Sequence, residues 1–167
     1  MKNLFFVLAI LFTFVFGAWG AMRVVKVIQF DRNCEGYLKR AADANTVELA
    51  AKNLAVAVKY LKSNKLTSGY TSFLWRTPDE DVGFWYENIT SALKELLAVR
   101  PDASQLERTN VLMKLRETLL DEGQSVSVTV PAGMSIFPAN ASYAIVGFFL
   151  SFFAGVLWLT ALIADDY

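Results

Sequence analysis

The side chains that carry most enzymatic chemistry are scarce in this chain. Its 167 residues include no histidine and a single cysteine, Cys34. Histidine is the commonest general base and a frequent metal ligand, so nucleophile–histidine pairs and histidine metal sites are excluded. The sequence also holds no CxxC motif and no phosphate-binding glycine loop. We therefore expect no enzymatic activity, no catalytic residue and no cofactor.

Two further groups could carry chemistry, and each has a simpler interpretation. The acidic run Asp79-Glu80-Asp81 could bind a hard cation, but it follows Thr77-Pro78, and acids in the first turn of a helix stabilise its dipole. We therefore expect no metal. For Cys34 a free or buried thiol is the favoured interpretation, with acylation or a link between two chains as the alternatives.

An aromatic cluster is the most distinctive candidate contact site. It comprises Tyr70, Phe73, Trp75, Arg76, Phe84, Trp85 and Tyr86. Aromatic residues and arginine are enriched at the centres of protein interfaces, and aromatic side chains also line small-ligand pockets. A third interpretation is that these rings close one end of a helical bundle. The predicted order of helices puts the cluster at the turn farthest from the membrane.

The balance of charge excludes one class of partner. Lys and Arg together number 16, and Asp and Glu together also number 16. Binding of nucleic acid relies on clustered basic residues that neutralise phosphates, and no such cluster is present. We therefore expect no nucleic-acid partner.

Both ends of the chain are apolar enough to lie in a lipid bilayer. Residues 142–164 contain no charged residue, and about 20 apolar residues suffice for a helix to cross the hydrocarbon core. Residues 3–22 form a second such run. A signal peptide with a cleavage site near Ala18-Trp19-Gly20 is the alternative for that run. Its length up to Met22 favours an uncleaved transmembrane helix.

Small residues recur at every fourth position in both apolar runs. They are Ala9, Thr13, Gly17 and Ala21 in the first, and Gly147, Ser151 and Gly155 in the second. A spacing of four places each set on one helix face, and small faces allow helices to pack closely in lipid. We expect the two spans to pack against each other or against a partner.

Residues 23–141 are expected to form a helical domain outside the membrane. The apolar period predicts helices at about 33–64, 78–99 and 102–122, followed by an extended segment at 124–141. Asn45 and Glu48 resemble an N-cap and its capping-box partner, so the first helix is expected to kink or restart there. The fold class is therefore mainly α: two transmembrane helices flank a bundle of about three helices, with an extended return segment and a possible short β element.

The apolar faces of the three middle helices follow from the same period. On 33–64 the main stripe is Val47, Ala51, Leu54, Val58 and Leu61, and a second stripe is Leu49, Val56 and Tyr60. On 78–99 the inward residues are Val82, Trp85, Ile89, Leu93 and Leu96. On 102–122 they are Leu106, Leu112, Leu115 and Leu119, with Gly123 as the stop. The expected path leaves the membrane, returns, and leaves again, so that 124–141 makes the final return and pairs with another copy or forms an irregular linker.

The layout of span, bundle and span resembles the sensing half of bacterial chemoreceptors and histidine kinases. Those proteins continue into signalling domains after the second span, whereas this sequence has only Asp165-Asp166-Tyr167 beyond it. We expect an integral protein of the bacterial inner (plasma) membrane. Lys2 favours a middle domain outside the cytoplasm, although Arg23, Lys26 and Arg32 argue for the reverse.

Two functions fit these features. The first is a non-enzymatic scaffold or accessory subunit that forms a homo-oligomer or joins another membrane protein. The alternative is a ligand-binding sensor that acts through a partner.

Overall fold

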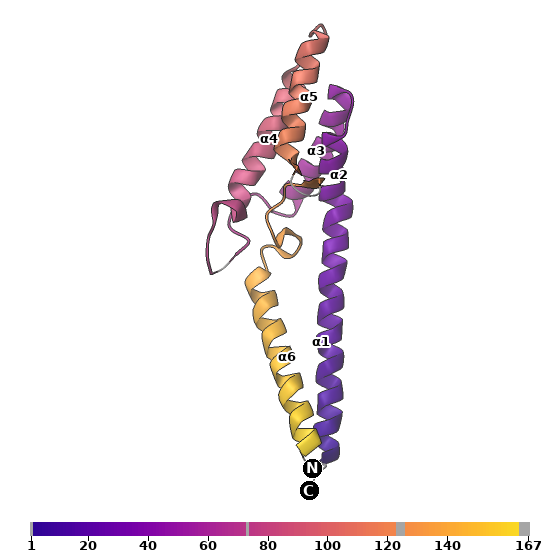
Figure 1. Cartoon of the computed structure of the whole chain (residues 1–167), viewed down its shortest axis with the longest axis vertical. Coiled ribbons are helices and arrows are strands. Elements are labelled where there is room, and N and C mark those ends of the chain that lie inside the picture. The colour runs from indigo at the N-terminus through magenta and orange to yellow at the C-terminus, as the bar shows by residue number, and fades with distance from the viewer. Residues whose placement is uncertain (1, 73, 123–125, 164–167) are drawn as a thin grey trace.

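The computed structural model describes residues 2–72, 74–122 and 126–163. Helix α1 (Lys2–Phe30) runs along the molecule and α6 (Asn140–Ile163) lies beside its lower half (Figure 1). The other helices form a head above α6, and both ends of the described chain lie at the opposite, lower end. The molecule is therefore a helical head on a stalk of two helices.

The two stalk helices are long and apolar enough to cross a membrane. The 24 residues of α6 extend about 36 Å at the helical rise, against a hydrocarbon core of about 30 Å. Few residues in their most apolar segments are buried within the molecule. The prediction of a mainly helical chain with two such helices is confirmed.

Helix α1 does not end at the head but continues into it. A π-helical turn at Asp31–Glu35 joins it to α2 (Gly36–Ala42) without a break. The N–H of Gly36 donates to the carbonyl of Asp31, and a Cβ on Gly36 would lie 3.0 Å from that oxygen. Glycine thus suits the close approach of backbone at the end of this wide turn.

Of the two alternatives predicted within 33–64, a kink or a new helix start, the structure shows a new start. The chain turns at 43–46, and α3 (Val47–Ser63) begins after it. Thr46, not Asn45, caps α3, because its hydroxyl accepts a hydrogen bond from the N–H of Leu49 at 3.2 Å. The predicted main stripe is confirmed, since all five of its residues are buried.

The helix predicted from residue 78 starts later. Residues Pro78–Glu80 form a short 3₁₀ turn, and the N–H of Thr77 donates to the Glu80 carboxylate at 3.2 Å. Helix α4 (Val82–Ala98) follows, capped by Asp81, whose Oδ1 accepts from the N–H groups of Gly83 and Phe84. The inward face of α4 is as predicted, with Leu93 partly buried and the other four residues buried.

Helix α5 (Gln105–Leu119) is shorter at both ends than the predicted 102–122. Leu106 was wrongly assigned to its inward face, because it is 70% exposed. Nine residues separate Leu106 from the buried Leu115, and nine residues amount to half a turn beyond two full turns. Gly123, the predicted stop, lies outside the described residues.

The strand-like part of 124–141 pairs with the end of the preceding helical segment in the same chain. Strand β1 (Leu120–Glu122) pairs antiparallel with β2 (Val126–Val128), with Asp121 opposite Ser127. A 3₁₀ turn, η3 (Met134–Ile136), then leads to α6. This turn packs against α1, so the segment between α5 and α6 is held against the long helix.

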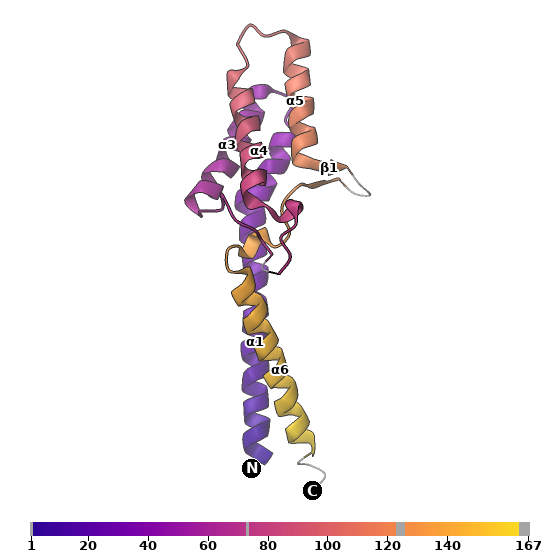
Figure 2. The same cartoon turned by 90° about the vertical axis from the view of Figure 1, so that its left-hand side faces the viewer.

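The path of the head differs from the predicted one. Helix α3 returns towards the stalk, α4 leaves it and α5 returns again (Figure 2). The turn at 99–104 is therefore the far end of the head, and the loop between α3 and α4 lies at the end facing α6. The predicted direction was wrong because the break within 33–64 was not expected to turn the chain back, and this turn reverses the direction of every later helix of the head.

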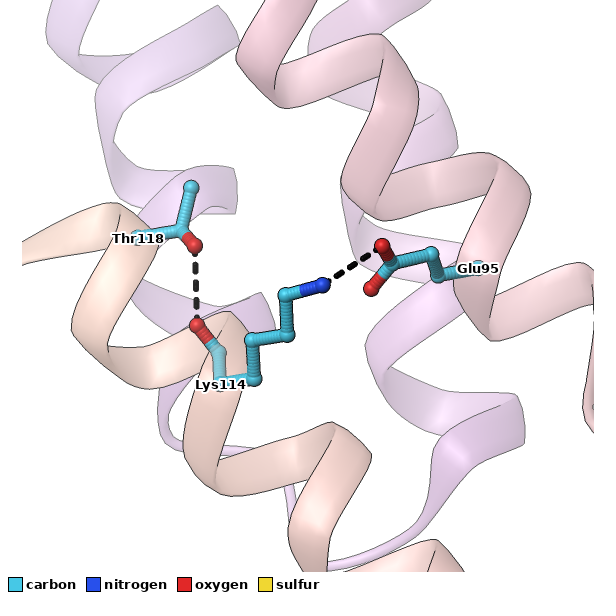
Figure 3. A network of polar contacts seen from close by, with 3 residues as sticks. All are labelled: Glu95, Lys114 and Thr118. Carbon is cyan, nitrogen blue, oxygen red and sulfur yellow. Dashed lines mark hydrogen bonds and ion pairs between the residues drawn. The ribbon is translucent and has the colours of Figure 1, made fainter.

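An exposed ion pair and burial in a common core hold α4 and α5 together. Lys114 Nζ lies 2.6 Å from Glu95 Oε1, and the Thr118 hydroxyl donates to the Lys114 carbonyl at 2.8 Å (Figure 3). Exposed pairs of this kind contribute about 0.2–1 kcal/mol. Ile89, Leu96, Leu115 and Leu119 are buried in the common core of the head, and burial of a side chain of this size contributes more, about 1.5–3 kcal/mol each.

The buried thiol of Cys34 provides a test of this packing. Cys34 is fully buried in the π turn, and burial, with a smaller effect from Glu35, raises its thiol pKa to about 12. At pH 8 the thiolate population should be about a thousand-fold below that of a thiol with the ordinary value of 9.0. Maleimide should therefore label Cys34 only after denaturation, as followed by mass spectrometry. Rapid labelling of the folded protein in mild detergent would contradict the packing.

Candidate functional site

The end of the head that faces α6 carries the main candidate site. Its principal element is the loop at residues 64–81, between α3 and α4, which we call the base loop. Two backbone hydrogen bonds close its neck: Thr71 N–H donates to the Glu80 carbonyl at 3.1 Å, and Val82 N–H donates to the Gly69 carbonyl at 2.9 Å. The base loop is therefore a closed structure on the end of α4.

A glycine joins the base loop to the segment that precedes α6. Gly69 has a φ of +108°, a conformation that glycine adopts without strain. A Cβ at this position would lie 3.1 Å from Cζ of Phe137. The Phe137 ring thus packs directly on the Gly69 backbone, and this contact places the neck of the base loop beside η3.

The aromatic residues predicted as contact candidates separate into two groups. Tyr70, Trp75 and Phe84 are exposed, and the Arg76 guanidinium carbon lies 5.4 Å from the centre of the Tyr70 ring. Arg76 is itself exposed. Phe73 lies outside the described residues.

The remaining two aromatics belong to the interior. Trp85 is buried, and its indole N–H donates to the carbonyl of Thr129 at 2.7 Å. Tyr86 is partly buried against the core. The bond from Trp85 ties α4 to the chain that follows β2, which is a structural role.

An apolar groove of about 390 Å³ runs beside Trp85. Its apolar lining comes from the start of α4 and from the segment after β2: Pro78, Phe84, Trp85, Ile89, Val130 and Pro131. The second half of this lining was missed from the sequence, because no local pattern pairs residue 85 with residue 130. The volume falls in the range of small-ligand sites, and the groove is open along one side.

A polar pocket of about 300 Å³ lies between α1, the end of α3 and η3. Its polar side chains include Lys26, Gln29, Asn33, Asn64 and Ser135. Burial, together with the nearby Cys34, raises the pKa of the Tyr60 phenol on its wall. The pocket offers amide and hydroxyl hydrogen bonds with one cation, which suits a polar or anionic group. Sequence reasoning missed it, because its residues come from three distant segments.

The small residues of the stalk also separate into two groups. Ala9 is buried, Thr13 accepts a hydrogen bond from the Trp158 indole at 3.0 Å, and Gly147 packs under the Trp19 ring. A Cβ added at Gly17 or Gly155 would meet nothing within 4 Å. The α1–α6 contact thus uses part of each predicted face. Ala21 and Ser151 are exposed with Gly17 and Gly155.

No group of three or more Cys, Asp or Glu side chains in the described residues is placed to hold a metal ion. The acidic run 79–81 serves the start of α4, where Asp81 is the cap. Comparison with known proteins finds no family model, no curated protein and no solved structure that matches this chain.

The two glycines of α6 give a matched test of the stalk. A Cβ on Gly147 would lie 2.5 Å from the Trp19 ring, whereas Gly155 is open. Gly147→Leu should separate α1 from α6 and lower the melting temperature in detergent, and Gly155→Leu should leave it unchanged. Equal melting temperatures for the two variants would contradict the packing of Trp19 on Gly147.

Proposed function

We propose that α1 and α6 cross a lipid bilayer together and hold the head at its surface. The support is that almost all of their apolar residues are exposed on the molecule. Exposure of this much apolar surface costs free energy in water but not in lipid. Trp19 and Tyr143 lie with ring centres 6.1 Å apart at the head end of the stalk, and Arg23 follows. Aromatic rings followed by a basic residue are typical of the level where a helix leaves the hydrocarbon.

We further propose that the protein is a non-enzymatic scaffold or accessory subunit, which assembles with copies of itself or with another membrane protein. One observation carries this proposal: two residues of the second apolar stripe of α3, Leu49 and Val56, are left exposed by the described residues, whereas the third, Tyr60, packs against Phe30. Leu49 is 46% exposed and Val56 is 39% exposed. Both line an open groove of about 610 Å³ between α2 and α3, which Tyr37 and Ala44 also line.

The stripe on α3 supports assembly for a physical reason. Leu49 and Val56 are seven residues apart, so they lie on one face of the helix, and the opposite face already fills the core. A helix with two apolar faces gains free energy when both are buried. The rim of the groove carries Arg40, Asp43 and Lys52, which suits the polar rim of an interface.

A double substitution tests assembly through α3. Leu49→Asn with Val56→Asn should abolish association, measured by light scattering after gentle detergent extraction, while the melting temperature stays close to that of the wild type. The matched control is Leu106→Asn with Met113→Asn, which removes two exposed apolar residues from one face of α5. A wild-type protein of 18.6 kDa alone, with no partner, would contradict the scaffold proposal.

The apolar groove beside Trp85 favours a second candidate function, a ligand-binding sensor. A groove of about 390 Å³ with Phe84 and Pro131 on its walls would take a small apolar or aromatic molecule. Such a ligand should raise the melting temperature in proportion to the logarithm of its concentration once the groove is saturated. Asn88→Trp, a change at an exposed residue of the lining, should obstruct the groove and remove that effect, whereas the scaffold function does not require the groove to be open.

For orientation we propose a bacterial plasma membrane with the head outside the cytoplasm. The apolar run after Lys2 supports this orientation, because a run of this kind near an N-terminus directs export of the downstream segment. Both ends of the described chain lie at the end of the stalk away from the head, as two spans require.

Labelling of introduced cysteines tests the orientation. Asp102 lies in the far turn of the head, and its side chain is 76% exposed. Asn3 is exposed at the end of the stalk away from the head. Each is replaced by cysteine. In a Cys34→Ala background, an impermeant maleimide should label position 102 in intact cells and position 3 only after permeabilisation. Labelling of position 3 alone would reverse the orientation, and labelling of both in intact cells would contradict the spans.

A further inference from the structure

The base loop lies at the level where the stalk enters the head. In both views it descends from α4 to the height of the first turn of α6 (Figures 1 and 2). That turn ends at Tyr143, whose ring lies beside the ring of Trp19. The base loop therefore reaches the level of the aromatic residues that mark the end of the apolar part of α1.

Two large apolar side chains on this loop have no cover from the described chain. Leu74 is 64% exposed and Trp75 is 76% exposed. They are neighbours in sequence, and both are far more exposed than Trp85, which is only 8% exposed. An indole is among the side chains most enriched at the boundary between lipid headgroups and acyl chains, because it has an apolar body and a polar N–H.

The loop is built to hold these residues in place. Its neck is closed by the Thr71–Glu80 and Gly69–Val82 backbone bonds, and its return is fixed by the Thr77–Glu80 bond. Phe137 packs on Gly69 from the side of η3. An anchored loop loses little further conformational entropy when its tip enters a new environment, which favours insertion.

We propose that the base loop is a third membrane contact, which inserts Leu74 and Trp75 between the headgroups of the bilayer that α1 and α6 cross. Lipid is the occupant that the geometry selects, because the loop points along the stalk and lies level with its aromatic end. A protein partner at this position would need to occupy the headgroup layer. Arg76, whose guanidinium lies near the Tyr70 ring, is placed to meet lipid phosphates. The inference rests on the proposed membrane spans.

Depth measurement with a fluorescent label tests the insertion. Single cysteines are introduced in a Cys34→Ala background at Leu74, at Ile145 and at Leu106, labelled with an environment-sensitive dye, and placed in nanodiscs of phosphatidylcholine and phosphatidylglycerol. Ile145 is an exposed residue of α6, and Leu106 is as exposed as Leu74 but belongs to α5 in the far half of the head. The lipids carry a nitroxide quencher near the headgroup end of the acyl chain.

The three positions separate failure of the inference from failure of the spans. Loss of emission at 74 and 145, with none at 106, is the expected result. Quenching at 145 without quenching at 74 would overturn the inserted loop and leave the spans intact. No quenching at 145 would overturn both. Quenching at 106 as well as at 74 would overturn the loop as a specific contact, because the whole head would then lie on the lipid.

Discussion

The structure depends on one uninterrupted helix that forms half of the stalk and part of the core of the head. From Lys2 to Ala42 the backbone stays helical through the π turn, so its N–H and C=O groups are satisfied within the segment. Any single helix that crosses lipid must satisfy its backbone groups in this way, and water permits the same arrangement. The same helix contributes Phe30, Cys34 and Leu38 to the core of the head. The head is therefore continuous with the stalk, and its position follows from the direction of α1.

The parts of the fold that could be predicted are those with a strong local cause. The two apolar helices could be predicted from the length of their uncharged runs alone. Helix α4 could be predicted because its inward residues repeat at the helical period and its start is rich in capping groups. The π turn could not be predicted, because Asp31-Arg32-Asn33-Cys34-Glu35 lies within an ordinary helical pattern, and only the packing of Cys34 distinguishes it. The break at 43–46 was visible as a possible kink, but the sequence did not show that α3 reverses direction. That reversal decided which end of the head carries the aromatic loop.

Residue type alone did not separate structural residues from surface residues. Trp75 and Trp85 belong to one predicted cluster, yet one is exposed on a loop and the other donates a hydrogen bond to Thr129 from the core. The decisive difference is the period of α4, which places Trp85 three residues after buried Val82. In the same way Gly147 and Gly155 share a predicted face, but a spacing of eight residues turns the helix by about 80°. Only the position of the Trp19 ring shows which glycine is in contact.

A head held by a rigid helix restricts which surfaces can meet which partners. Helix α3 runs roughly along the long axis of the molecule, so its uncovered stripe of Leu49 and Val56 faces sideways. If α1 and α6 cross the bilayer, that stripe faces along the membrane plane at a fixed height. A partner in the same membrane, or a second copy, then presents its surface at a matching height. Because the membrane already restricts the position and orientation of both proteins, less translational and rotational entropy is lost when they associate. A freely diffusing protein gains no such advantage. Under the proposed membrane spans, this geometry favours lateral assembly over recruitment from solution.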